Sequence, residues 1–245
     1  MRYIKHQLIL FALFSLYIII RLIGISDIDF TFWQSIWVFA VKDSLLLLIM
    51  IFFTYFILDS IRHRPRIGPR IISGKTLKKI LYPALTLSWL AVVIHTFFEA
   101  VKILLPFKLL PLYQFADFMD ETISHVFMFL PVIIMLFIAT FLEIERPLPE
   151  VLAKKETIFL SLLSFLSGII WGLNLTEGRL AFATSLPVML IYLFSTLYFF
   201  KKYNLKLLSR PWNLTVLIVF ASGSISLIAW NLIFQSTPEL FTILQ

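Results

Sequence analysis

The stretch "YPALTLSWLAVVIHTFFEAVKIL", residues 82–104, decides the fold class of this chain. It is long and apolar enough to cross a bilayer as a helix, which takes about 17 to 25 residues. Lipid offers the backbone no hydrogen-bond partner, and the stretch lacks the alternation of a membrane β-strand, so we expect a helix. The same stretch holds His95 and Glu99, whose spacing of four places them on one helix face. It is therefore predicted to be a transmembrane helix that carries a polar site.

The composition of the whole chain is typical of an integral membrane protein. Of 245 residues, 60% are hydrophobic, 14% are charged and 26 are Phe, whereas soluble domains carry roughly 25% charged residues. We expect an all-α bundle of about seven transmembrane helices, forming a single polytopic domain over residues 1–245. The predicted spans are residues 7–24, 35–58, 82–104, 121–142, 157–174, 181–200 and 213–235.

Basic residues predict the orientation of this bundle. If successive connections alternate between sides, sixteen Lys and Arg lie on the amino-terminal side, against four on the other. The sixteen fall within residues 1–6, 59–81, 143–156 and 201–212. Because cytoplasmic connections carry the excess of Lys and Arg, the amino terminus is expected in the cytoplasm and the carboxyl terminus outside. We therefore expect a multi-pass protein of the cell membrane.

The net charge of +7 needs no nucleic acid partner, since most of it belongs to this topology signal. The segment "RHRPRIGPR", residues 62–70, is also expected to touch anionic lipid headgroups. The absence of cysteine excludes disulfides and thiolate metal sites. The expected partners are therefore membrane lipid and a hydrophobic small molecule.

A second His/Glu pair lies on the next predicted span. In "DETISH", residues 120–125, Glu121 and His125 repeat the spacing of His95 and Glu99 in reverse order. Consecutive helices are usually neighbours, and ionisable residues inside a membrane usually serve a function. We therefore expect the four side chains to line one cavity in the outer half of the bundle. The inner halves of the spans hold fewer polar residues.

Three runs of this sequence resemble the emopamil-binding protein family, the EXPERA-domain membrane proteins that include sterol Δ8-Δ7 isomerases. The runs are "LTLSWLAVVIHTFFEAVKIL", "DETISHVFMFLPVIIMLFIATFL" and "SGIIWGLNLTEG", within about residues 84–178. In that family a His-x-x-x-Glu helix precedes a helix that opens with Glu-Thr, which here are His95, Glu99, Glu121 and Thr122. The family has four or five spans, whereas this chain has seven predicted spans.

The resemblance implies the migration of a double bond in a lipid-like molecule, without a cofactor. An acid protonates an alkene, and a base then removes a proton from the neighbouring carbon. The implied catalytic residues are His95 and Glu99 as the proton-donating pair and Glu121 as base or cation stabiliser. Burial favours the neutral form of a carboxyl, and a histidine can relay its proton. The residues expected to contact the substrate are Thr122, His125, Trp89, Trp171, Asn174 and Asn231.

Two other classes of function stay open, so the chain need not be an enzyme of this kind. His95, Glu99, Glu121 and His125 form a ligand set that suits zinc or non-haem iron, which would make a metal-dependent membrane enzyme. The same residues suit a non-catalytic transporter, receptor or membrane-complex subunit that binds a proton, an ion or an amphipathic ligand. An ordinary retinal protein is excluded because the last predicted span lacks lysine.

A purely structural role for the same residues is the remaining alternative. Glu99 and Lys102 are three residues apart and are placed to form an ion pair, while His95 can bridge two helices. The segment "SGSIS", residues 222–226, gives the last span a face of small side chains. Such a face predicts close packing against another helix.

Overall fold

The computed structural model describes residue 9 and residues 43–105, 111–174 and 181–234, and the regular structure in these residues is entirely helical. The elements are α3 (Asp43–Arg62), α4 (Gly74–Leu104), α5 (Pro111–Phe118), the π-helix η2 (Met119–Ser124), α6 (His125–Glu145), α7 (Lys154–Asn174), α8 (Ala181–Lys202), the 3₁₀ turn η3 (Leu207–Ser209) and α9 (Pro211–Phe234). The first predicted span, residues 7–24, lies outside the described residues.

The helical fold class is confirmed, and the predicted spans from residue 82 onward each coincide with a helix. In the described part of the chain, three helices are long and apolar enough to cross a membrane: Gly74–Leu104, Lys154–Leu173 and Pro211–Ile233. The chain is therefore a helical protein with helices suited to a membrane. The count of seven spans and the orientation of the termini stay predictions.

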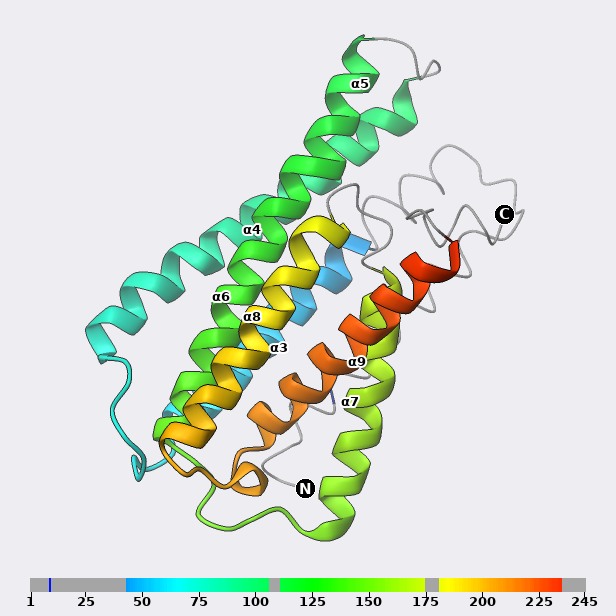
Figure 1. Cartoon of the computed structure of the whole chain (residues 1–245). Coiled ribbons are helices and arrows are strands. Elements are labelled where there is room, and N and C mark those ends of the chain that lie inside the picture. The colour runs from blue at the N-terminus through cyan, green and yellow to red at the C-terminus, as the bar shows by residue number, and fades with distance from the viewer. Residues whose placement is uncertain (1–8, 10–42, 106–110, 175–180, 235–245) are drawn as a thin grey trace.

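The long helices run alternately up and down along the bundle (Figure 1). α4 packs along α6, α7 packs along α9, and α8 also contacts α9. Among the described elements, α5 and the adjoining parts of α4 and α6 extend beyond the ends of α3 and α8. The hydrophobic core includes Met135, Tyr192 and Phe220, and the Tyr192 ring lies 4.8 Å from that of Phe220.

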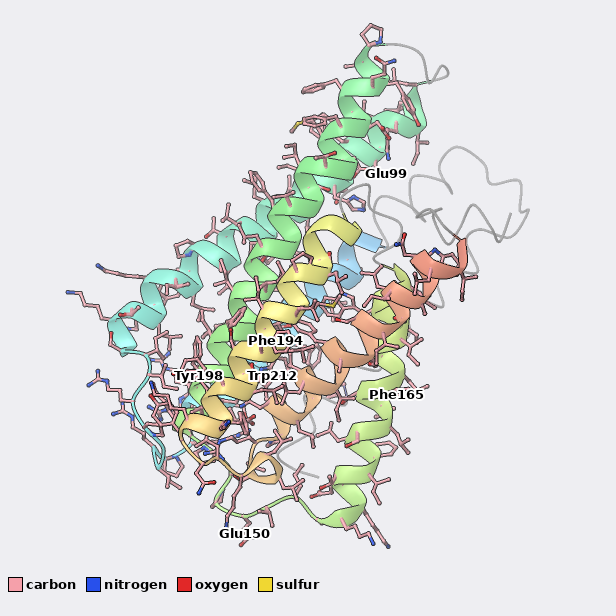
Figure 2. The ribbon with its side chains drawn as sticks, in the orientation of Figure 1. Glu99, Glu150, Phe165, Phe194, Tyr198 and Trp212 are labelled. Carbon is pink, nitrogen blue, oxygen red and sulfur yellow. The ribbon has the colours of Figure 1, made fainter. Side chains whose placement is uncertain are left out.

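Large apolar side chains also cover the outer surface of the helices. Phe165, Phe194 and Tyr198, labelled in Figure 2, are 48%, 67% and 58% exposed. A soluble monomer rarely presents contiguous apolar patches of large size. This surface agrees with helices that contact lipid on their outer faces.

Small side chains allow α7 and α9 to approach closely, as the sequence predicted. A Cβ on Gly168 would overlap Ser222 and the backbone of Val219, and a Cβ on Gly172 would overlap Ser226 and the backbone of Gly223. The Ser226 hydroxyl donates a hydrogen bond to the carbonyl of Ile169 across this contact, at 3.2 Å. Close backbone approach of this kind stabilises helix association within a membrane.

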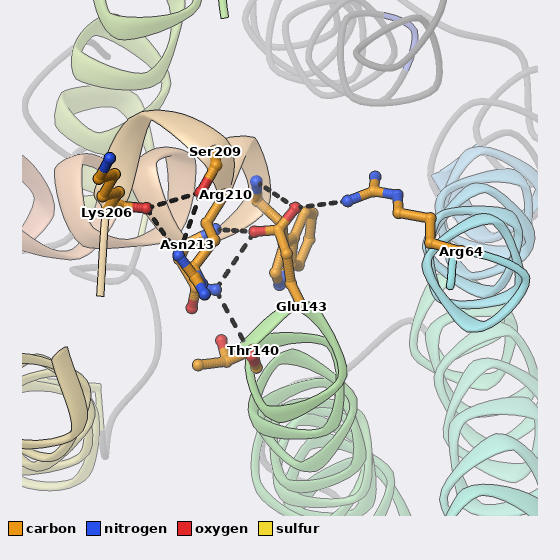
Figure 3. A network of polar contacts seen from close by, with 8 residues as sticks. Arg64, Thr140, Glu143, Lys206, Ser209, Arg210 and Asn213 are labelled. Atoms are coloured by element: carbon orange, nitrogen blue, oxygen red, sulfur yellow. Dashed lines mark hydrogen bonds and ion pairs between the residues drawn. The ribbon is translucent and has the colours of Figure 1, made fainter. Parts of the chain in front are cut away.

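We call the end of the bundle where α6 ends and α9 begins the basic end. There the fully buried carboxylate of Glu143 joins three segments (Figure 3). The backbone amides of Trp212 and Asn213 donate to it at 3.1 and 2.8 Å, and Arg64 contacts it at 3.1 Å. The first amides of a helix have no partner within the helix, and the helix dipole favours an anion there. Glu143 therefore caps α9 and neutralises the buried Arg64 guanidinium.

Glu145, two residues further on, holds the connection between α3 and α4 against the end of α6. Its carbonyl accepts hydrogen bonds from the amides of Ile67 and Gly68 at 3.1 and 2.9 Å. Its carboxylate accepts from the amides of Ile71 and Ile72 at 2.5 and 2.6 Å. Gly68 is required because a Cβ there would overlap the carbonyl of Ile144.

This network corrects one expectation from the sequence. The inner halves of the spans were expected to be poor in polar residues, yet Glu143, Glu145 and Asn213 are all buried at this end. The predicted span boundaries at residues 142 and 213 placed Glu143, Glu145 and Asn213 at or near the edges of connections. Burial follows because the helices extend beyond those boundaries and pack to their ends.

We predict that Gly172→Ala destabilises the protein by about 1 to 3 kcal/mol, because the added methyl group overlaps backbone atoms of Gly223 that have no room to move. The free energy of unfolding in SDS titrations would measure the loss. Gly74→Ala is the matched control, since nothing lies within 4 Å of a Cβ at that position. Equal stability of the two variants would contradict the close packing of α7 and α9.

We predict that Glu143→Gln lowers the free energy of unfolding by about 3 to 5 kcal/mol, because it leaves Arg64 buried without a negative partner. Glu150→Gln, at an exposed carboxylate near the same end, should have little effect. Thermal melts of the two purified variants would check the difference. A Glu143→Gln melt that overlays that of Glu150→Gln would refute the role of this carboxylate.

Candidate functional site

Four ionisable side chains meet where α4 packs against η2, and we call them the acid–base cluster: His95, Glu99, Lys102 and Asp120. His95 Nδ1 lies 2.5 Å from Asp120 Oδ1. Lys102 Nζ lies 2.6 Å from Asp120 Oδ2 and 2.8 Å from Glu99 Oε2. Figure 2 labels Glu99, which lies in the part of α4 that extends beyond α3 and α8. The cluster is thus at the opposite end of the bundle from Glu143.

Helical spacing explains why α4 supplies three of the four residues. His95, Glu99 and Lys102 are separated by four and three positions, so they follow one another along the same face of an α-helix. The ion pair between Glu99 and Lys102 confirms the structural prediction made from this spacing. The remaining member comes from a different kind of helix.

Asp120 lies in the π-helix η2, Met119–Ser124, between α5 and α6. The Ser124 hydroxyl donates a hydrogen bond to the Asp120 carbonyl within this element. The widened turns of a π-helix change which residues share a face, and such elements are frequent at functional sites. The expected α-helical spacing of Glu121 and His125 is therefore interrupted, since Glu121 lies in η2 and His125 begins α6.

The cluster is largely buried but not sealed. Asp120 is 0% exposed, while Lys102, His95 and Glu99 are 11%, 15% and 21% exposed. Two carboxylates this close repel unless a cation or a proton lies with them. Lys102 supplies the cation, with its Nζ 2.8 Å from Glu99 and 2.6 Å from Asp120, and a proton on one of the carboxyl groups would balance the second negative charge. With that proton and a neutral His95, the cluster has no net charge.

Contact with Asp120 determines the state of the His95 ring. An ionised carboxylate only accepts hydrogen bonds, so Nδ1 of His95 carries the proton in this pair. Nε2 is then the nitrogen at which the neutral ring can gain a proton. This is the orienting role that a buried carboxylate plays beside a catalytic histidine.

Aromatic side chains border the cluster on the outer face of α4 and α5. The ring of Phe98, next to Glu99, lies 5.7 Å from that of Phe115 and 5.0 Å from that of Phe97, both in edge-to-face geometry. Phe97, Phe115 and Phe118 are 60%, 53% and 50% exposed. Such a surface suits contact with a hydrophobic molecule, and aromatic faces can stabilise a nearby cation.

The structure joins only some of the predicted site residues to this cluster. His95 and Glu99 are in it, and the half-buried Thr122 follows Asp120 on η2. The side chains of Glu121, His125 and Asn174 lie outside what the structure describes, so their predicted roles stay predictions.

The other predicted substrate contacts have partners elsewhere. Trp89 is 43% exposed and packs edge to face against Phe52 of α3, with ring centroids 5.7 Å apart. Trp171 packs against Phe220 between α7 and α9, at 5.9 Å. Asn231 is half-buried on α9, a helix that supplies no residue to the acid–base cluster. None of the three has a described contact with His95 or Glu99.

The cluster fits poorly with the alternative of a zinc or iron site. Among the described residues, no three His, Asp or Glu side chains converge on a common point suited to a metal ion. Lys102 Nζ already lies between Glu99 and Asp120, where a metal ion would compete with the ammonium group. Glu121 and His125, the other proposed ligands, fall among the side chains that are not described.

Asp120 is the cluster residue that the sequence analysis missed. It opens the quoted segment "DETISH", but the spacing argument selected its neighbour Glu121. A signal was present in the concentration of carboxylates at Asp117, Asp120 and Glu121, which would lie close together on one face of an α-helix and repel one another. The π-helix that resolves this choice has no recognisable sequence signature here.

Comparisons with known proteins return no family: no protein-family model, no curated protein and no solved structure matches this chain. The resemblance to the emopamil-binding protein family therefore stays a prediction from the motifs alone. A function for this chain is therefore inferred from the geometry of the acid–base cluster.

We predict that Lys102→Met lowers the free energy of unfolding by about 3 kcal/mol or more, because it leaves two buried carboxyl groups without their cation. The double variant Lys102→Met/Glu99→Gln should recover part of that loss, with a coupling of about 0.5 to 3 kcal/mol. SDS titration of four proteins, the wild type, the two single variants and the double variant, would measure both values.

Lys79→Met is the matched control, because Lys79 is exposed on the same helix and has no acidic partner among the described residues. Its effect should stay within about 0.5 kcal/mol. Additive single effects of Lys102→Met and Glu99→Gln would contradict a shared charge cluster.

Proposed function

We propose that this chain is a multi-pass membrane protein whose acid–base cluster exchanges protons with a hydrophobic, lipid-like molecule and shifts a double bond within it. We further propose the seven-span topology, with the amino terminus in the cytoplasm of a cell whose plasma membrane holds the protein. The observation that carries the proposal is the 2.5 Å contact between His95 Nδ1 and the buried Asp120. It supports a histidine oriented for proton transfer beside a carboxyl group.

The surroundings of the cluster support an apolar substrate. Glu99 and His95 keep partial exposure, whereas Asp120 behind them has none. Exposed phenylalanine side chains lie on α4, the helix that carries Glu99 and His95, and on the neighbouring α5. A hydrophobic molecule that approaches through the bilayer would therefore meet Glu99 and His95 before it met Asp120.

The reaction follows from the roles of the individual groups. Glu99, as a neutral carboxyl, gives its proton to one alkene carbon, whose π electrons form the new C–H bond and leave a cation on the other carbon. Nε2 of His95 removes a proton from the adjacent carbon, and the electrons of that C–H bond form the shifted double bond. One proton enters the molecule and one leaves, so no oxidant or cofactor takes part. Asp120 and Lys102 are positioning residues that hold His95 and balance charge.

A non-catalytic binding protein is the second candidate. The ion pairs of Lys102 with Glu99 and Asp120 give every member of the cluster a charged partner. Such an arrangement also suits a transporter, receptor or complex subunit that takes up a proton with its ligand. Glu121 is retained as a proposed cation stabiliser in the first candidate and as a proposed ligand contact in the second.

Deuterium transfer tests the catalytic proposal without advance knowledge of the substrate. The purified protein would be incubated in D₂O with total lipid from its expression host and with a panel of sterol and isoprenoid alkenes. Mass spectrometry would then detect carbon-bound deuterium, because a double-bond shift through protonation leaves one solvent proton on carbon. We expect incorporation with the wild-type protein and about 10²- to 10⁴-fold less with Glu99→Gln or His95→Phe.

Two controls make the outcome decisive. Glu150→Gln removes an exposed carboxylate at the far end of the bundle and should leave the rate unchanged. Prior treatment with EDTA should also leave it unchanged, since the proposal contains no metal step. Ligand-dependent thermal shifts without deuterium on carbon would reject catalysis in favour of the binding protein.

A further inference from the structure

A face rich in exposed cations covers the end of α3, the connection at residues 63–73 and the first two turns of α4. Its members, which we call the basic face, are Arg62, Arg70, Lys75, Lys78 and Lys79. None of these five side chains pairs with an acidic residue in the part of the chain that the structure describes. The nearby exposed carboxylate, Asp59, contacts His63 at 3.5 Å. The five charges are therefore not neutralised within the described protein.

The backbone that presents these cations is held in place. Ile67, Gly68, Ile71 and Ile72 donate their amides to Glu145, as described above. Arg146 Nη1 donates to the carbonyls of Arg62 and Arg64, both at 2.6 Å. Arg64 is buried against Glu143, and the exposed Arg66 forms an ion pair with Glu145. The connection thus uses two arginines for its own structure and leaves the other cations on the surface.

Apolar groups adjoin the basic face and indicate the class of partner. Ile67, Ile80 and Tyr82 are 65%, 37% and 59% exposed. A soluble polyanion would gain nothing from contact with these exposed apolar side chains, whereas a phospholipid offers a charged headgroup and an apolar chain together.

The position of α4 points to the same partner. Gly74–Leu104 is long and apolar enough to cross a membrane, so its first turns lie at the level of the lipid headgroups. Side chains of Lys at this level extend toward the phosphates while their methylene stems stay in apolar surroundings. Each Lys or Arg near an anionic leaflet adds to the attraction.

We propose that the basic face is a binding site for anionic phospholipid, with the phosphate held by cations at the start of α4 and by Arg62, and an acyl chain against the exposed side chains of Ile80 and Tyr82. The proposal is independent of the reaction assigned to the acid–base cluster, which lies at the other end of α4. Basic residues at this end are also expected to set the orientation of the helices, and the proposed site gives them a defined lipid contact in addition.

Native mass spectrometry of the full-length protein in detergent tests the site with short-chain phosphatidylglycerol and phosphatidylcholine as probes. We expect wild-type protein to bind phosphatidylglycerol at least about tenfold more tightly, because several basic residues each favour the anionic headgroup. A variant with Arg62, Arg70, Lys75, Lys78 and Lys79 all replaced by Gln should lose that preference. If that variant does not fold, Lys75→Gln/Lys78→Gln/Lys79→Gln should lose most of it.

The matched control replaces five other exposed cations at the same end of the bundle with Gln: Lys154, Lys155, Lys201, Lys202 and Lys206. It changes the net charge equally and should keep the preference for phosphatidylglycerol. Equal losses in the two variants would show a general charge effect and overturn the site. If inorganic phosphate displaced phosphatidylglycerol as effectively as added phosphatidylglycerol does, the assignment of the site to a lipid would be overturned.

Discussion

The carboxylate of Glu143 is the contact on which the arrangement of this bundle depends. It lies at the end of α6 and binds the first amides of α9 and the guanidinium of Arg64, which follows α3. Three helices that are distant in sequence therefore meet at one buried negative charge. In an apolar surrounding, such a group is costly unless all of its partners are present. The cost of a missing partner makes this junction specific, since other packings of the same apolar helices would leave the charge unpaired.

The two ends of α6 use charged residues in different ways. At the basic end, Glu143 and Glu145 are fully enclosed, and their partners include backbone amides that a substrate could not displace without unfolding a helix terminus. At the other end, the acid–base cluster consists of side chains alone, three of them partly exposed and one a histidine. Side chains can exchange protons and change partners while the backbone stays in place. We therefore attribute a structural role to Glu143 and Glu145, and the proposed proton transfer to the acid–base cluster.

The sequence predicted much of the helical framework because the signal is local. Runs of apolar residues and the spacing of His95, Glu99 and Lys102 depend only on helix geometry. The small residues at 222–226 correctly indicated close packing, although their partners Gly168 and Gly172 could be identified only in three dimensions. Predictions about Glu121 and His125 rested on α-helical spacing between these two residues, and the π-helix removes that basis. Trp89 and Trp171 were selected for their chemistry, whereas neighbouring rings on α3 and α9 decide their contacts.

By itself, the sequence determined that this chain forms apolar helices and that one of them carries a stripe of ionisable residues, because both properties follow from residue type and a period of 3.6. Only the tertiary structure decided which carboxylate meets His95. A single widened turn in η2 places Asp120 in the cluster, and the energy of that turn is repaid by contacts with α4, about twenty residues earlier in the chain. The burial of Glu143 was likewise decided by packing, since its partners come from the ends of two other helices. Charge pairing between distant segments has no local signature, which is why the sequence alone could not supply it.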